Sequence, residues 1–259
     1  MQTTDRLIRN LALLTFAFAG VVSIAVNAEE AQPPGVLETF TCSYNAGKDI
    51  DDVLAARDYY VKQAAKAGVD IGPAYLWTLI KGDLPFDAVW LAPHQNLGAY
   101  AASADAQAAA PELSDVLARF NSAVTCTPRL GTTRTVFQRE VPDRADAPAI
   151  VTAFACGVRE GVTPVGIADL EGHIADVLGG MEDNAPNVVF SLTPTTGGAN
   201  TPDWLLFSVF DSMTSWANFV GGLFSSDAGQ QLVRHVNAVA DCDQAIWGSQ
   251  RVIAPPASE

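Results

Sequence analysis

Residues 40–47, FTCSYNAG, and residues 154–161, FACGVREG, are two versions of one pattern. In each stretch an aromatic residue precedes a small residue and a Cys, and a Gly follows five positions after the Cys. A second match surrounds the other two Cys residues, because LARFNSAVTC at 117–126 corresponds to VRHVNAVADC at 233–242. The matched Cys residues lie 114 and 116 positions apart, so the sequence predicts a tandem duplication.

The two predicted repeats span residues 37–140 and 148–254. The segment between them, REVPDRADAPA at 139–149, is rich in Pro, Asp and Arg, which is typical of an exposed connection. A repeat longer than 100 residues indicates duplication of a whole folding unit rather than a solenoid.

Each repeat contains the same predicted order of elements. A short β-like run is followed by a segment with helical apolar spacing. In the first repeat this segment includes Ile50, Val53 and Leu54, and its N-terminal end carries Asp49, Asp51 and Asp52. Two strands follow in each repeat, at 73–80 and 86–92 and at 187–193 and 203–210, and then long helical regions at 95–124 and 212–240. With a last strand, the order is β-α-β-β-α-β, which predicts an α+β fold built from ferredoxin-like units.

Four Cys residues allow three disulfide pairings, and composition does not choose among them. In a ferredoxin-like unit the spatial strand order is 4-1-3-2, so the fourth strand lies antiparallel beside the first. Cys42 is late in the first strand of its repeat and Cys126 begins the fourth, with Cys156 and Cys242 at the equivalent places. The fold therefore predicts the disulfides Cys42–Cys126 and Cys156–Cys242.

The first 28 residues have the features of a secretory signal peptide. Arg6 and Arg9 precede the 16-residue apolar run LALLTFAFAGVVSIAV, and Val26 and Ala28 are the small residues that suit cleavage after Ala28. The alternative is an uncleaved anchor, although a membrane span needs about 20 residues. We expect a periplasmic or secreted protein of 231 residues with no membrane association after cleavage.

The expected mature chain is strongly acidic. Removing the leader, which holds Asp5, Arg6 and Arg9, leaves 13 basic and 28 acidic residues and a net charge of −15. Such a chain repels phosphate backbones, so nucleic acid is not an expected partner. An apolar content of 49% is ample for a folded core.

Two fused ferredoxin-like units resemble the dimeric α+β barrel superfamily, in which two such sheets pack face to face. The paired F-x-C and C-x-x-x-x-G marks also look like those of uncharacterised exported bacterial proteins. The resemblance implies a pseudo-dimeric barrel in one chain, and hence a monomer. The superfamily includes small cofactor-free monooxygenases, haem-binding enzymes and proteins that only bind or scaffold, so the fold alone does not choose a function.

The three His residues are the first candidates for chemistry. His94 follows a predicted strand where a helix begins, and it is the candidate catalytic or haem-binding residue, with a polar loop residue as the alternative. His173 and His235 lie on the two helices predicted to cover one sheet, so they can approach each other. A metal site there is conceivable, but a solvated helix face is favoured and no metal is predicted.

Aromatic residues on the strands form a candidate ligand pocket. Residues 75, 77 and 79 alternate onto one strand face, and an apolar space between sheet and helices would be lined by Tyr75, Trp77, Trp90 and Phe207. The alternative is that these side chains are simply core.

Three functions remain open from the sequence. The first is an exported protein that binds a small apolar ligand between sheet and helices. The second is a cofactor-free or haem-using barrel enzyme that employs His94. The third is a structural or interaction module without a pocket. No nucleophile elbow, P-loop or dinucleotide motif occurs in the chain, and the cofactor is left open.

Overall fold

The computed structural model describes residues 34–140, 147–181, 184–198 and 201–254. The predicted signal peptide and most of the predicted linker lie outside these residues. The first half contains β1 (Gly35–Tyr44), α1 (Ile50–Ala67), β2 (Ala74–Lys81), β3 (Ala88–His94), α2 (Leu97–Ala109), η1 (Pro111–Leu113), α3 (Val116–Ala123) and β4 (Val124–Gln138). The second half contains β5 (Ala149–Val158), α4 (Pro164–Gly179), β6 (Val188–Pro194), β7 (Trp204–Phe210), α5 (Met213–Ser225), α6 (Asp227–Val239) and β8 (Ala240–Ile253).

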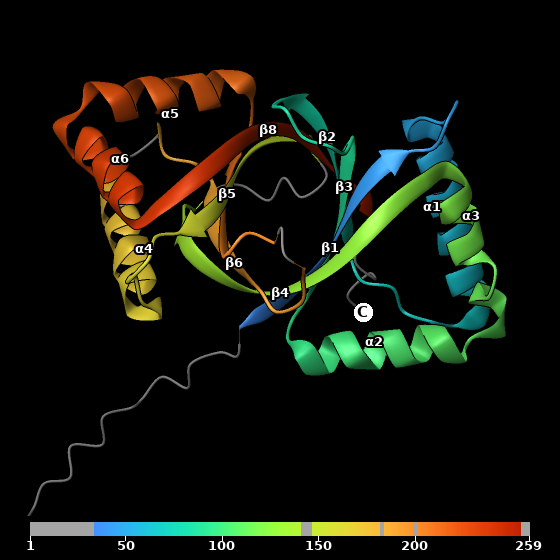
Figure 1. Ribbon diagram of the computed structural model, residues 1–259. Coiled ribbons are helices and arrows are strands. Elements are labelled where there is room, and N and C mark those ends of the chain that lie inside the picture. Colours follow the sequence, from blue (N-terminus) through green and yellow to red (C-terminus); the bar gives the residue numbers. More distant parts are fainter. Residues whose placement is uncertain (1–33, 141–146, 182–183, 199–200, 255–259) are drawn as a thin grey trace, which may run out of the picture. The chain divides into compact units, whose positions relative to one another are not determined.

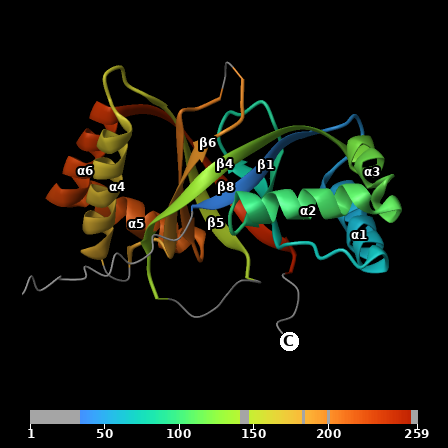
Figure 2. The ribbon, with the colours of Figure 1, turned by 90° about the horizontal axis from the view of Figure 1, so that it is seen from below.

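The strands form one closed antiparallel barrel in the order β1-β3-β2-β8-β5-β7-β6-β4. Within it, the first half has the order β4-β1-β3-β2 and the second half has the order β8-β5-β7-β6, which is the predicted 4-1-3-2 arrangement. The pairs β2–β8 and β4–β6 join the halves. Helices α1–α3 lie on one side of the barrel and α4–α6 on the other (Figures 1 and 2). The fold is therefore a mixed α+β fold with an eight-stranded barrel.

Local sequence signals set the helix boundaries. Asp49 and Asp52 form a capping box at the start of α1, and Gly68 ends that helix with a φ of 66°. The two long helical regions expected from the sequence are each broken into shorter helices. Pro111, which has no N–H to donate, begins η1 after α2, and the side chain of Ser226 caps α6 directly after α5.

Side chains along each strand point alternately into the barrel and toward the helices, so the core has one part inside the barrel and another between the sheet and the helices. Odd-numbered residues of β1, β2 and β3 point into the barrel, where Leu37, Trp77 and Leu91 join one apolar cluster with Phe207 and Trp247. Even-numbered residues of the same strands face the helices. Since side chains fill the barrel, its interior is a packed core rather than a channel.

The structure contains two disulfides, Cys42–Cys126 and Cys156–Cys242, which are the predicted pairs. In both cases the two Cys residues stand directly opposite each other in the ladder between the first and last strands of one half. Within the described residues, no helix is long and apolar enough to span a membrane.

A buried carboxylate connects the halves. Glu171 on α4 is 6% exposed, and its Oε2 accepts a hydrogen bond of 2.8 Å from Arg134 on β4. Its Oε1 accepts one of 3.1 Å from the Nε1 of Trp204 on β7, which is 2% exposed. The second half thus binds a strand of the first half through a charged hydrogen bond as well as through the sheet.

Removing either disulfide should destabilise the protein strongly. The loops closed by the disulfides span 84 and 86 residues, and releasing one enlarges the unfolded ensemble. Replacing both Cys156 and Cys242 with Ser should lower the free energy of unfolding by about 2–5 kcal/mol in urea titrations. The matched pair of changes at Cys42 and Cys126 should cost a similar amount, and an unchanged midpoint in both would contradict this expectation.

Replacing Glu171 with Ala should leave the Trp204 N–H buried without an acceptor. We expect a loss of about 1–3 kcal/mol in the free energy of unfolding, measured by urea titration. Glu171→Gln keeps an acceptor oxygen and should cost less. The exposed Glu160→Ala change serves as the control. Equal losses for Glu171→Ala and Glu171→Gln would show that the hydrogen bond to Trp204 is not the stabilising contact.

Candidate functional site

His94 is the last residue of β3, immediately before the helix that the side chain of Asn96 caps. On β3 it shares the helix-facing side with Trp90, and its ring meets that of Tyr100 on α2 edge to face, with 5.3 Å between centroids. The sequence placed His94 correctly at this strand-to-helix junction. Whether it takes part in chemistry depends on what surrounds it.

Several polar side chains share the helix-facing side of the first half with His94. We call them the α2 cluster: Glu38 on β1, Tyr60 on α1, His94 on β3, and Tyr100, Ser103 and Gln107 on α2. Tyr60 donates a hydrogen bond of 2.9 Å to the Oε1 of Gln107, and the Nε2 of Gln107 donates one of 3.0 Å to Ser103. The residues of α2 that face inward are therefore polar, and that helix buries no residue fully.

Glu38 places a negative charge inside this cluster. Its register partner on β3 is Ala92, so His94 is its diagonal neighbour on the same sheet face, within reach of long side chains. Burial raises the pKa of the Glu38 carboxyl. Burial, and then the charge of Glu38, raise the pKa of Tyr60 to about 12, while the Glu38 charge is the main cause that raises the pKa of Tyr100.

Burial disfavours the charged form of the His94 imidazole. Its Nε2 is buried and has no hydrogen-bond partner among the described residues. Burial lowers the pKa of His94, because the positive form would lose its hydration without gaining a partner. A neutral imidazole with an unused buried nitrogen can accept a proton from a bound molecule or donate a hydrogen bond to it.

The same positions in the second half are mainly apolar. The ladders place Phe210 where the first half has His94, and Thr152 where it has Glu38. Counted from the helix caps, Ile174 replaces Tyr60 and Trp216 replaces Tyr100. Thr152 keeps one buried, unpaired hydroxyl oxygen, but no charge remains. Since the fold forms with apolar residues here, it does not require the α2 cluster.

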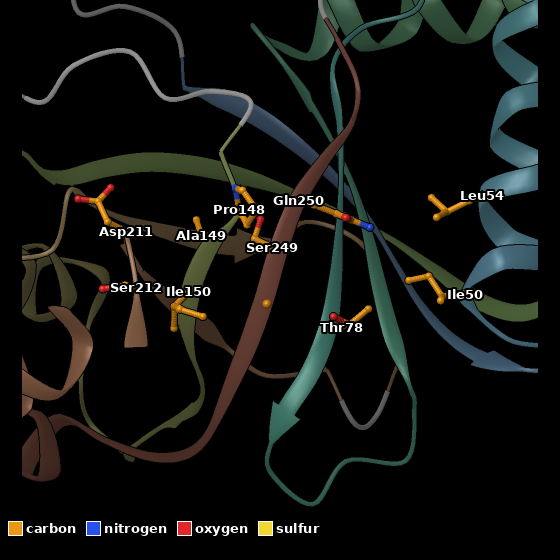
Figure 3. Close-up of a pocket in the computed structure, with 11 residues that line it drawn as sticks. Ile50, Leu54, Thr78, Pro148, Ala149, Ile150, Asp211, Ser212, Ser249 and Gln250 are labelled. Carbon is orange, nitrogen blue, oxygen red and sulfur yellow. The ribbon is translucent and has the colours of Figure 1, made fainter. Parts of the chain in front are cut away.

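A separate cavity of about 440 Å³ lies on the outer face of the barrel, across β2, β8 and β5 (Figure 3). In Figure 3, Ile50 and Leu54 of α1 lie on one side and Asp211 and Ser212 on the other. The lining is completed by Thr78, Pro148, Ala149, Ile150, Gly248, Ser249 and Gln250. Both halves thus contribute to a space that combines apolar and hydrogen-bonding groups.

The four aromatic residues predicted to form one pocket do not lie together. Tyr75, Trp77 and Phe207 belong to the barrel interior, where Trp77 and Phe207 meet with ring centroids 5.2 Å apart. Trp90 faces the helices and packs edge to face on Phe120 at 5.6 Å. The reason is the register: Leu76, not Trp77, is opposite Trp90, and directly opposed residues share a face. The predicted position between sheet and helices is therefore wrong for three of the four.

His173 and His235 do approach each other, as their helices predicted. The ring centroids are 5.3 Å apart. Within the described residues, no group of three or more His, Cys, Asp or Glu side chains could hold a metal ion.

Haem was one cofactor that the α+β barrel resemblance allowed, with His94 as its ligand. The residues do not fit it. The His94 ring contacts the Tyr100 ring at 5.3 Å between centroids, no cavity of haem size is found beside it among the described residues, and the cavity in Figure 3 is lined by no His, Cys, Met or Tyr. No step is therefore assigned to haem.

Sequence reasoning missed Glu38, Tyr60 and Tyr100. Aligning the two repeats position by position would have found them, because Glu38 and Tyr60 stand where the second repeat has Thr152 and Ile174. In such an alignment, a position with a charged or polar residue in one repeat and an apolar residue in the other is a candidate for a functional role in the first.

Solved structures share this fold. A candidate monooxygenase from Fusobacterium nucleatum superposes with a TM-score of 0.55 at 14% identity, covering 87% of this chain and 96% of the other. An anthrone oxidase-like protein gives 0.51 at 14% identity, with 89% and 98% covered. A candidate monooxygenase from Lactobacillus acidophilus gives 0.51 at 10% identity, with 86% and 96% covered. No protein-family model and no curated protein matches the sequence. At these identities the likeness shows that the fold is shared.

The lowered pKa of His94 should make stability depend on pH. The unfolded chain protonates this His near its ordinary pKa of 6.5, while the folded protein does so only at lower pH. Between these values the unfolded state binds more protons, so stability falls as the pH drops below 6.5. In urea titrations at pH 7.5 and 5.5, His94→Phe should show a smaller loss on acidification than the native protein, and equal losses would contradict the assignment.

Proposed function

We propose that the protein is a cofactor-free enzyme that binds a small organic molecule in the α2 cluster and uses His94 as its acid or base. The observation that carries this proposal is the Nε2 of His94, which is buried without a hydrogen-bond partner among the described residues, on the sheet face that also holds the partly buried Glu38. Leaving a polar group buried and unpaired costs about 1–3 kcal/mol. The second half avoids most of that cost with Phe210 and Thr152, so a function explains why the first half retains it.

The chemistry follows from the protonation states. The neutral His94 accepts a proton at Nε2 from a bound molecule and becomes an imidazolium ion. We assign the stabilisation of that positive charge to Glu38, the diagonal neighbour of His94 on the same sheet face. Tyr100 keeps its phenolic proton because its pKa is raised, so its hydroxyl can donate a hydrogen bond to the same molecule. The Tyr60 hydroxyl already donates to Gln107 and instead holds that side chain in place.

The names of the structural neighbours agree with this class of activity. Two are candidate monooxygenases and one is an anthrone oxidase-like protein. At 14% identity or less they support the fold and not a substrate. The reaction assigned here rests on the α2 cluster.

A second candidate function is binding without chemistry. The cavity in Figure 3 lies between α1 and the outer sheet face, where a small, partly apolar ligand was expected from the sequence. Of the four predicted aromatic contacts, only Trp90 is on the outer sheet face, and it packs against Phe120 rather than lining this cavity. Tyr75, Trp77 and Phe207 belong to the core.

We further propose that the protein is exported and that its halves arose by duplication. The leader-like residues 1–28 and the two disulfides support a periplasmic or secreted location. The matched strand order, disulfide positions and caps support two ferredoxin-like repeats at 37–140 and 148–254. Because the two halves already close one barrel, we expect a monomer.

The test uses changes that copy the second half. His94→Phe and Glu38→Thr place the residues of Phe210 and Thr152 at their equivalents and should leave the fold intact. A library of small aromatic and carbonyl compounds is screened by thermal shift, and hits are followed by mass spectrometry for conversion. We expect compounds that bind and convert with the native protein to lose conversion at least a hundredfold in His94→Phe.

His235→Asn, which alters an imidazole of the other half, is the control and should behave as native. Conversion that persists unchanged in His94→Phe would overturn the catalytic role. Binding without conversion that is abolished by Leu54→Trp, which fills the cavity in Figure 3, would favour the second candidate function.

A further inference from the structure

We propose that His173 and His235 form a binding site for one divalent transition-metal ion on the surface of the second half. His173 lies on α4 and His235 on α6, and the two helices pack against each other. The ring centroids are 5.3 Å apart and the ring planes are tilted by 48°. This site is independent of the α2 cluster, which lies in the other half.

The spacing of the rings suits chelation. A metal ion binds imidazole nitrogen at about 2.0–2.1 Å, so two nitrogens about 3 Å apart can share one ion. Rings with centroids 5.3 Å apart present facing nitrogens at roughly that distance after small rotations about their side-chain bonds. Among the described residues, neither imidazole has a hydrogen bond that would occupy its nitrogens, and both side chains are half-buried.

The helices hold the two rings in place. Leu170 and Ile174 of α4 and Leu232 and Val239 of α6 are buried in one apolar cluster. His173 and His235 lie beside these residues, at the solvent edge of the packed seam. Since the backbone of each helix is fixed by this packing, little ordering is needed when an ion binds.

The donor set selects the class of ion. Two neutral imidazoles favour Cu²⁺, Ni²⁺ and Zn²⁺ over Mg²⁺ and Ca²⁺, which prefer oxygen ligands. Because no third protein ligand is grouped with the pair in the described chain, water completes the coordination shell. Asp169 and Asp176, exposed on the same face of α4, and the net charge of −14 attract cations to this surface.

The first half shows that the fold does not require His at this seam. Counted from the helix caps, Tyr59 is equivalent to His173, and counted back from the second Cys of each half, Arg119 is equivalent to His235. The Arg119 guanidinium lies 3.8 Å from the centroid of the Tyr59 ring, a cation–π contact that closes the seam without metal-binding groups. The second half has instead two imidazoles, which attract each other weakly without an ion.

The experiment titrates the disulfide-intact chain, carrying no histidine tag, with CuSO₄, NiCl₂ and ZnCl₂ by calorimetry, and records the thermal midpoint with each ion. We expect one ion per chain, a Kd in the micromolar range, and a raised midpoint. His173→Asn and His235→Asn should each weaken binding at least tenfold. MgCl₂ should give neither heat of specific binding nor a shift.

The matched control gives the second half the residue types that the first half has at the equivalent positions, Tyr59 and Arg119. The double change His173→Tyr and His235→Arg should keep the metal-free midpoint close to native while abolishing binding, which separates metal binding from folding. His94→Phe should bind the ions as the native protein does. The proposal is overturned if the native chain binds no ion, or if the Asn variants and the double variant bind as tightly as native.

Discussion

Strands β4 and β8 each form hydrogen bonds with a strand of both halves, and the barrel depends on this double pairing. β4 pairs with β1 over residues 124–133 and then with β6 over 131–138, while β8 does the same with β5 and β2. Gly131 lies where β4 passes from its pairing with β1 to its pairing with β6. A Cβ added at this residue would lie 2.7 Å from the Cδ1 of Leu192 and 2.9 Å from the carbonyl oxygen of Thr193. Closure of the barrel therefore leaves no room for a side chain at this point.

The strand order and both disulfides could be predicted because the internal repeat and local signals determine them. The matched Cys positions reveal the repeat, the alternation of apolar residues and the turn residues mark the strands within it, and one topological rule gives their spatial order. The pocket of aromatic residues could not be predicted in this way. Which face of a strand points into the barrel is fixed only when β2 pairs with β8 of the other half, and Trp77 and Trp90 fall on opposite faces as a result. The α2 cluster is also non-local, since Glu38, Tyr60 and His94 come from three elements.

The two halves share a backbone and differ in chemistry at matched positions. Where the first half has His94 and Glu38 beneath a helix, the second has Phe210 and Thr152. Where the first half joins its helices through Tyr59 and Arg119, the second has His173 and His235. Each half can therefore be compared with the other. Positions at which both halves have the same kind of residue are those that packing requires, and positions at which the residues differ are free to acquire a function.

The disulfides lie within the halves, whereas the seams β2–β8 and β4–β6 are held by hydrogen bonds and side-chain contacts alone. Most of the folded chain is therefore enclosed in one of two covalent loops, each fastened at the ladder between its first and last strands. If the barrel opens along a seam, each loop still holds its own strands at the Cys register, so rejoining requires only that two tethered sheets find each other. A barrel that has opened along one of these strand pairs can therefore close again without re-forming the strand order within either half.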